Sequence, residues 1–183
     1  MLLAMEHCAL LGYKRPGLAV RSETNIRLEF RWQAAHEVAS KYLGLESPFP
    51  LLASEWTAEN VGRWLKDEHP DVVIGPVLGR LAELIDASGV KIPDDVGMLG
   101  LLVPRSGDRL TGVLQSGDTI GATAVDQLIS QLERNETGIP EHPITHTMLG
   151  RWNPGETTRQ RGSATLSQKR RVISVGLGLG LSH

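Results

Sequence analysis

Short apolar runs with the character of buried strands alternate with helix-forming segments along most of this chain. The clearest run covers residues 71–75, which are rich in β-branched side chains and lie between two prolines. The runs are continuously apolar, which is typical of parallel strands buried on both faces. Since parallel strands need a crossover between them, their spacing of roughly 20–30 residues predicts an α/β fold with a Rossmann-like parallel sheet and flanking helices. The other predicted strands cover residues 16–20, 48–53, 96–103, 110–115 and 144–149.

The segments between these strands carry helix-type spacing and capping residues. Thr24 or Asn25 can cap one long helix that continues through Tyr42. Thr57 and Asn60 have the spacing that opens another helix. Further helices are predicted over residues 2–11, 78–87 and 119–136, the last of them capped by Asp118 or Thr119.

Composition and charge narrow the class of protein. The 183 residues are 40% hydrophobic and 22% charged, which is enough for an ordinary globular core. A net charge of −2 excludes a uniformly basic nucleic-acid coat. There is no apolar run of about 18 residues and no basic segment before the first apolar residues, so we expect a cytoplasmic protein with no membrane partner. The single cysteine, Cys8, fits a reducing compartment and a small core residue.

Residues 159–183 depart from this pattern. They contain five basic residues and no acid, whereas all 21 acidic residues lie before them. The segment ends in a Gly-x-Gly-x-Gly run, but a dinucleotide site would need a helix after it. We therefore treat residues 159–183 as a basic, glycine-rich tail without a predicted structure.

Patterns that carry catalysis or metal binding are scarce. The sequence has no nucleophile elbow, no phosphate-binding loop and no His-Glu-x-x-His motif, so we predict no enzyme, no cofactor and no metal. His142 and His146 lie in a proline-flanked extended stretch and are interpreted as solvated side chains. Asp94 and Asp95 follow a proline and are interpreted as a turn.

Two side chains are candidates for binding a small molecule. Trp56 directly follows the strand at 51–54, at the sheet edge where ligands bind in parallel α/β folds, and its ring offers a stacking face. The alternative is a packing role. Arg27 lies near the entry to the helix after the first strand and can clamp a polar ligand through its guanidinium. The alternative is a surface ion pair with Glu23 or Glu29.

A series of co-linear motifs resembles the LacI/GalR family of bacterial transcription regulators. The family's Pro-Asp strand is similar to residues 70–74, and its helix with Arg-Leu is similar to Arg27-Leu28. The most specific stretch is residues 88–100, which resemble "x-G-L-x-V-P-E-D-V-x-V-V-G". The match runs from about residue 3 to residue 158, and its other segments are 5–20, 111–115 and 120–129.

This resemblance implies a fold, a domain organisation and partners. Residues 1–115 would form the second lobe of the effector-binding domain, which has the type I periplasmic-binding-protein fold. Residues 116–158 would be the return helix and strand that belong with the first lobe. The DNA-binding domain and most of the first lobe would lie outside this sequence. The implied function is the ligand-sensing and dimerisation portion of a repressor-type regulator, with a small, carbohydrate-like effector and a homodimeric partner, and with DNA contacted only through another domain.

The resemblance also implies site residues. Arg27 matches the family's effector-binding arginine, Trp56 its stacking aromatic and Gln115 its hinge-strand glutamine. Gly75 and Pro76 stand where the family has Asn-Asp. Leucines stand for the acids after the fourth strand, and Phe30 stands for a glycine. Because a site built for hydroxyl groups loses affinity when its polar partners go, we expect no simple sugar in the standard mode. The predicted effector-binding residues are Arg27, Trp56, Gly75 and Gln115.

Two other function classes remain open at the level of the sequence. A periplasmic-type sugar-binding protein shares the two-lobed fold but is opposed by the missing signal peptide. A small doubly wound enzyme ranks last, because nothing supplies a nucleophile, a carboxylate pair or a phosphate loop.

Overall fold

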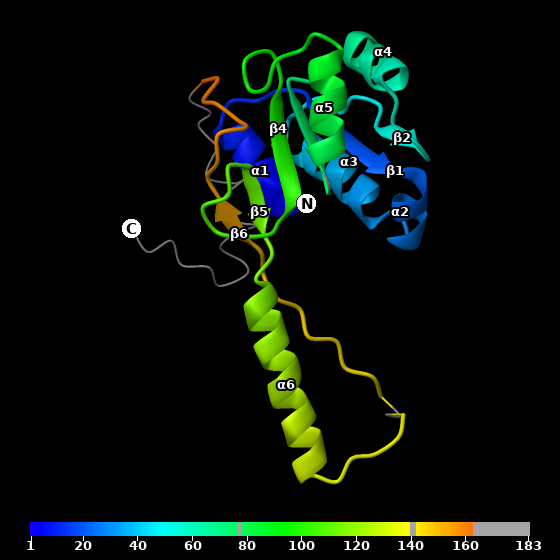
Figure 1. Cartoon of the computed structure of the whole chain (residues 1–183), viewed down its shortest axis with the longest axis vertical. Coiled ribbons are helices and arrows are strands. Elements are labelled where there is room, and N and C mark those ends of the chain that lie inside the picture. Colours follow the sequence, from blue (N-terminus) through cyan, green and yellow to red (C-terminus); the bar gives the residue numbers. More distant parts are fainter. Residues whose placement is uncertain (77, 140–141, 163–183) are drawn as a thin grey trace.

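The computed structural model describes residues 1–76, 78–139 and 142–162, in which one six-stranded sheet has the order β2-β1-β3-β4-β5-β6 (Figure 1). All neighbouring pairs from β2 to β5 are parallel, and β6 alone runs antiparallel to its neighbour. The predicted parallel α/β sheet is therefore confirmed. The strands are β1 (Pro16–Arg21), β2 (Leu51–Ala53), β3 (Val72–Gly75), β4 (Gly97–Val103), β5 (Gly112–Leu114) and β6 (Arg151–Asn153).

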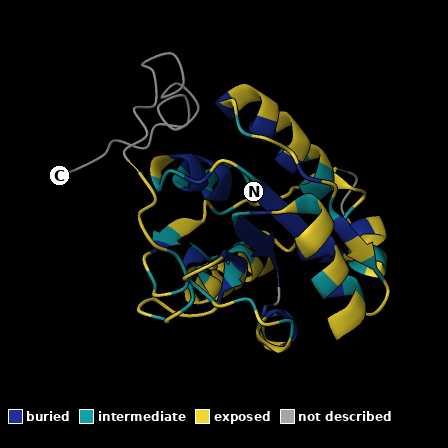
Figure 2. Ribbon diagram, turned by 90° about the horizontal axis from the view of Figure 1, so that it is seen from above, coloured by how far each residue is buried: buried dark blue, intermediate teal, exposed yellow. Residues whose placement is uncertain are grey.

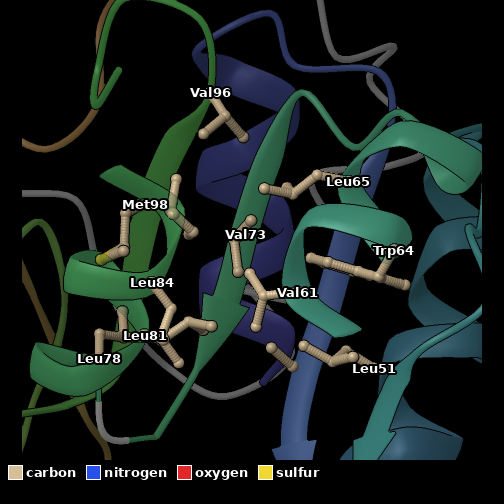
Figure 3. Packing of buried hydrophobic residues seen from close by; sticks show 12 residues of the cluster. Leu51, Val61, Trp64, Leu65, Val73, Leu78, Leu81, Leu84, Val96 and Met98 are labelled. Carbon is tan, nitrogen blue, oxygen red and sulfur yellow. The ribbon is translucent and has the colours of Figure 1, made fainter. Parts of the chain in front are cut away.

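Helices cover both faces of the sheet. On one face, Val73 and Met98 pack under two helices, with Val61 and Trp64 from one and Leu81 from the other (Figure 3). On the opposite face, the neighbouring strand residues pack under another pair of helices. The central strands are consequently buried and the outer helix faces exposed (Figure 2). The first pair is α4 (Ala58–Glu68) and α5 (Gly79–Ala87), the second is α1 (Leu2–Leu10) and α3 (Arg31–Leu43), and the remaining helices are α2 (Ser22–Arg27) and α6 (Gly117–Glu133).

The single long helix predicted through Tyr42 is wrong, because the chain breaks it into α2 and α3. Glu29 and Phe30 both adopt left-handed backbone conformations, with φ of 51° and 60°. Neither residue is a glycine, and for residues with a Cβ this conformation is unfavourable by about 1–2 kcal/mol of free energy. Apolar spacing does not report such a break, since the periodicity continues on both sides of it.

The C-terminal strand is also misplaced by the sequence prediction. Residues 144–149 form no strand, and the strand is Arg151–Asn153, whose Trp152 lies opposite Val113 of β5. Trp152 stacks on His7 of α1 with ring centroids 3.8 Å apart, and burial lowers the pKa of His7 to about 4. The position of this strand therefore depends on contacts with residues that are remote in sequence.

The helix α6 leaves the body of the protein after β5. It begins at Gly117 with Ser116 in the N-cap position, rather than with Asp118 or Thr119 as predicted. None of its residues is buried, and it points away from the sheet (Figure 1). Residues 163–183, most of the predicted tail, lie outside the described residues.

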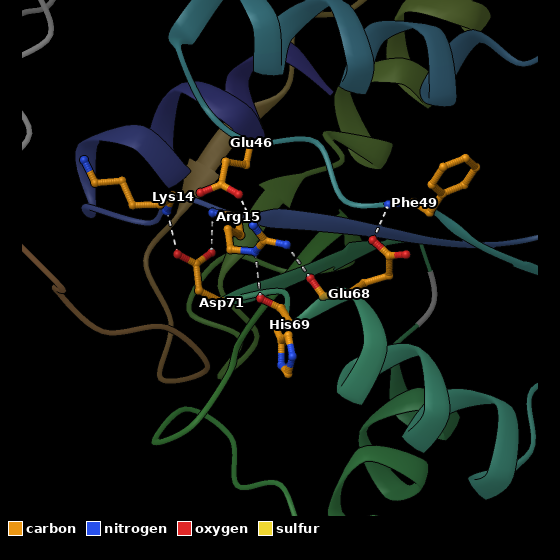
Figure 4. Close-up of polar contacts among 7 residues, drawn as sticks. All are labelled: Lys14, Arg15, Glu46, Phe49, Glu68, His69 and Asp71. Atoms are coloured by element: carbon orange, nitrogen blue, oxygen red, sulfur yellow. Dashed lines mark hydrogen bonds and ion pairs between the residues drawn. The ribbon is translucent and has the colours of Figure 1, made fainter.

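A polar cluster ties together the amino ends of β1 and β3. The Asp71 carboxylate accepts the backbone N–H groups of Lys14 at 2.5 Å and Arg15 at 2.9 Å (Figure 4). Arg15 donates to the carbonyl of Glu68 at 2.8 Å and pairs with Glu46. This cluster lies at the sheet edge opposite the carboxyl ends, so its role is to join strands and helices.

Candidate ligand-binding site at the carboxyl edge of the sheet

A cavity of about 470 Å³ opens where β1, β2 and β3 end. Arg21 is the last residue of β1, and Pro76 directly follows β3. The carboxyl edge of a parallel sheet is the usual binding place in such folds, and the volume is in the range of small-molecule pockets. The lining residues are Arg21, Thr24, Glu55, Trp56, Pro76 and Arg80.

The loop after β2 is held in place by the start of α4. Thr57 and Asn60 form a capping box, in which the Thr57 N–H donates to Asn60 Oδ1 at 2.9 Å and the Asn60 N–H donates to Thr57 Oγ1 at 3.2 Å. Asn60 Nδ2 also donates to the Glu55 carbonyl at 2.9 Å. The predicted helix start at Thr57 is confirmed, and it fixes the two residues that precede it, Glu55 and Trp56.

Trp56 lines the cavity and packs against the core on its other side. Its Nε1 is buried and has no hydrogen-bond partner among the described residues. A buried donor without a partner is unfavourable by about 1–3 kcal/mol, so packing and not a polar contact sets the position of this ring. The packing role considered for Trp56 is therefore confirmed, and the indole also forms a wall of the cavity, where its ligand role stays a prediction.

Arg21 is anchored at the mouth of the cavity. Its Nε donates to the Ser54 carbonyl at 2.9 Å, which ties the end of β1 to the end of β2. Glu23 lies nearby, and its pKa is lowered by hydrogen bonds from its own backbone N–H and from the Ser54 hydroxyl, with a further contribution from the charge of Arg21. Glu23 is thus a carboxylate at neutral pH and is engaged with Ser54.

The third wall is the turn from β3 into α5. Gly75 is buried, and a Cβ there would lie 2.7 Å from the Ala19 carbonyl oxygen, so the turn requires glycine. The helix that follows has no side-chain cap on Leu78 and no acidic residue in its first turn. Arg80 is in that first turn and pairs with Glu83 at 2.9 Å, with both side chains about 70% exposed.

The predicted site residues are only partly brought together. Trp56 lines the cavity, and Gly75 lies in the strand that ends beside it. Arg27 is exposed at the far end of α2 and does not line the cavity. Among the described residues it pairs with neither Glu23 nor Glu29, and Glu29 pairs with Arg31 instead at 2.6 Å. Gln115 follows β5 and lines a separate, shallow hollow of about 200 Å³ near the start of α6.

The sequence analysis missed Arg21, Thr24, Glu55 and Arg80. The signal that singled out Trp56, a position directly after a strand, applies to Arg21 as well, since β1 ends with it. Applying that rule to every strand would have found Arg21. Arg80 is not found by it, because Arg80 lies in the first turn of α5 and not directly after β3.

The remaining candidates have structural roles. Cys8 is fully buried, and burial together with the charge of Asp71 raises the pKa of its thiol, so it is a core residue as predicted. Asp95 accepts the Lys91 N–H at 2.9 Å in a turn, which confirms the interpretation of that acidic pair. Within the described residues, no group of three or more His, Cys, Asp or Glu could hold a metal ion, and His142 and His146 line a cavity beside α6. No helix in the described ranges is long and apolar enough to cross a membrane.

Comparison with known proteins identifies the fold. No protein-family model and no curated protein matches the chain. Among solved structures, it is similar to a LacI-family transcriptional regulatory protein from Corynebacterium glutamicum, with 19% identity and a TM-score of 0.63 over 87% of this chain and 65% of the other. The fold is that of LacI-family transcriptional regulators.

Two further structures have the same LacI-type fold. One is a LacI family transcriptional regulator from Enterococcus faecium with bound ribose, at 16% identity and a TM-score of 0.64 over 88% of this chain and 62% of the other. The second is the dimeric Lac repressor with an 11-residue C-terminal deletion, at 19% identity and a TM-score of 0.63 over 88% of this chain and 61% of the other. The chain therefore spans less than two thirds of the length of each of these regulators.

Proposed function

We propose that this chain is the ligand-sensing and dimerisation portion of a bacterial LacI-type transcription regulator. The observation that carries the proposal is the cavity at the carboxyl edge of a LacI-type lobe, with the Trp56 ring in its wall. A regulator with this fold holds ribose, which supports a small-molecule effector for this chain too. DNA would be contacted by a separate domain, the protein would act in the cytoplasm, and it would catalyse no reaction.

The proposed effector site extends along the whole carboxyl edge. Trp56 stacks on the effector, and Gly75 lets β3 end close to β1. Arg27 ends the helix after β1, and Gln115 follows β5, so both lie toward the edge at which the parallel strands end. An effector larger than the cavity itself would contact these two residues from the open side.

A ligand screen tests this function. We expect at least one member of a panel of sugars, sugar phosphates, nucleosides and organic acids to raise the melting temperature of the full chain. Trp56→Leu should lower the affinity for that ligand about tenfold, because the flat ring surface is lost. Arg27→Ala should also abolish the ligand response, while it changes the free energy of unfolding by less than about 0.5 kcal/mol, because Arg27 is exposed.

The control is Phe49→Leu, which alters an aromatic ring that is 78% exposed and lies outside the cavity. This variant should keep the ligand response of the wild type. If no compound in the panel stabilises the wild type, or if Trp56→Leu binds as tightly as the wild type, the proposed sensing function is wrong.

We also propose that the chain associates with a second copy through α6. The side facing the return segment is lined by Thr123, Ala124, Gln127 and Gln131. The apolar residues Val125, Leu128, Ile129 and Leu132 are 48–67% exposed. Val125, Leu128 and Leu132 are separated by three and four residues, which is the seam spacing of paired helices. A solved regulator with this fold is described as dimeric, which supports the same state here.

Replacing Leu128 and Leu132 by lysine should dissociate this dimer. Sedimentation velocity should show a dimer for the wild type and a monomer for the double variant, because two charges cannot be buried in an apolar seam. The melting temperature extrapolated to low protein concentration should barely change, since both side chains are exposed in the single chain. Gln127→Lys with Gln131→Lys places the same charge on the other side of the helix and should leave a dimer. A monomeric wild type would contradict the proposal.

A further inference from the structure

The cavity at the carboxyl edge carries an excess of positive side chains. Arg21 and Arg80 face one carboxylate, Glu55, among its lining residues, whereas Glu23 and Glu83, which interact with the two arginines, do not line it. We propose, on the basis of the sensing function proposed above, that the effector is a small organic anion. Its phosphate or carboxylate group binds between Arg21 and Arg80, and its ring lies against Trp56.

Arg21 is prepared for such a group by its anchor. The bond from Nε to the Ser54 carbonyl uses one edge of the guanidinium. The two terminal nitrogens of Arg21 have no hydrogen-bond partner in the part of the chain that the structure describes, although the Glu23 carboxylate is close enough to interact with its charge. A planar guanidinium held at one nitrogen presents its remaining donors in a fixed direction, which suits the bidentate binding of a phosphate or carboxylate.

Arg80 is held weakly by its intramolecular partner. The Arg80–Glu83 pair is separated by 2.9 Å on the surface, with side-chain exposures of 70% and 68%. Exposed pairs of this kind contribute little to stability, so a ligand anion can compete for the guanidinium. Glu83 lies one helical turn away on α5 and does not line the cavity.

The start of α5 adds to the two arginines. The neighbouring helix α4 has the Thr57 capping box and an acidic residue, Glu59, in its first turn. By contrast α5, which begins beside the same cavity, has neither a side-chain cap nor an acid. Its first N–H groups therefore keep their partial positive charge, which favours an anion next to Arg80.

The end of β3 provides no side-chain partner for a neutral hydroxyl group. Gly75 has no side chain and Pro76 has no N–H group, so the end of β3 offers no side-chain partner to a sugar hydroxyl. Among the lining side chains, Thr24 and Glu55 can accept a hydrogen bond from a hydroxyl group, and the two arginines can donate one to its oxygen. Because hydrogen bonds between two charged groups are the stronger ones, the guanidinium groups favour a phosphate or carboxylate over a neutral hydroxyl.

Calorimetric titration of the full chain with matched probes tests this inference. The probes are ribose 5-phosphate, ribonate, ribose and inorganic phosphate, which separate the phosphate, the carboxylate and the neutral ring. We expect ribose 5-phosphate or ribonate to bind at least about tenfold more tightly than ribose, and added salt to weaken the binding. Inorganic phosphate should bind more weakly than the sugar anion, because it lacks the ring.

Variants then test which positively charged side chains bind the anionic group. Arg21→Gln and Arg80→Gln should each reduce the affinity for the anionic probe about tenfold, and should leave the weak binding of ribose unchanged. Arg63→Gln removes the same charge from the exposed face of α4, outside the cavity, and should bind like the wild type. Full affinity in the Arg21→Gln, Arg80→Gln double variant would overturn the inference.

The outcomes separate this inference from the proposed function. If ribose binds as tightly as its phosphate and its acid, the anionic effector is wrong, while the sensing function stands. If none of the four probes binds, the anionic effector is also wrong, and the wider ligand panel described above decides the sensing function independently.

Discussion

Gly112→Ala is expected to destabilise the protein by about 3–5 kcal/mol, which is a large part of the roughly 5–15 kcal/mol that stabilises a typical protein. A Cβ at this position would lie 2.0 Å from the carbonyl oxygen of Gly100 and 2.8 Å from its backbone nitrogen. Those atoms belong to β4, whose Gly100 N–H donates to the Thr111 carbonyl at 2.8 Å. Because the new Cβ would clash with backbone atoms, no change of side-chain rotamer can relieve the clash, and β4 and β5 would have to move apart.

Urea denaturation followed by circular dichroism measures this effect. The matched control is Gly121→Ala in α6, where a Cβ would meet no atom within 4 Å. That variant should be unchanged or more stable by about 0.5–1 kcal/mol, because alanine favours a helix. A Gly112→Ala protein with the wild-type midpoint would show that the two strands are not as close as the structure places them.

Asn153→Ala is expected to lower the free energy of unfolding by about 3–4 kcal/mol. Asn153 is 2% exposed and bonds to the chain three times. Its Nδ2 donates to the carbonyls of Asp108 and Leu110 at 3.0 and 2.8 Å, and its Oδ1 accepts the Gly107 N–H at 2.9 Å. Alanine leaves all three backbone groups without these partners in a poorly hydrated place.

The segment after Asn153 increases the expected loss of stability beyond that of the three lost hydrogen bonds. The Thr157 hydroxyl donates to the Met98 carbonyl at 2.7 Å and accepts the Thr111 N–H at 3.0 Å, so it bridges β4 and the start of β5. Loosening β6 loosens these contacts as well. Thermal denaturation measures the change, and Gln131→Ala, which removes an exposed amide from α6, should remain within about 0.5 kcal/mol of the wild type. Equal stabilities for Asn153→Ala and the wild type would contradict the role assigned to Asn153.

The central strands could be predicted because each is buried on both faces. Residues 72–74 place Val73 under α4 and α5 and their neighbours under α1 and α3, so every position is apolar. The start of α4 could be predicted for a local reason, since Thr57 and Asn60 satisfy each other's backbone groups. Burial on two faces and local capping both produce a residue pattern that can be recognised in the sequence.

The errors have a common cause in contacts between remote residues. Residues 144–149 contain more apolar side chains than residues 151–153. The strand nevertheless forms at 151–153, where Asn153 donates to the Asp108 carbonyl and Trp152 stacks on His7. The break at Phe30 requires a left-handed residue that the apolar spacing does not indicate. In the site, Trp56 was found from its place after a strand, whereas its proximity to Arg80 depends on how β2 and β3 are ordered in the sheet.

The amino-acid sequence by itself determined the parallel α/β architecture, the helix start at Thr57 and the edge of the sheet at which the cavity lies. These features follow from periodicity, burial and capping, which act over a few residues. The tertiary structure alone decided the place of β6, the isolation of α6 and the convergence of Arg21, Trp56 and Arg80 around one cavity. Those features depend on which segments become neighbours, and that is set by the packing of the whole sheet.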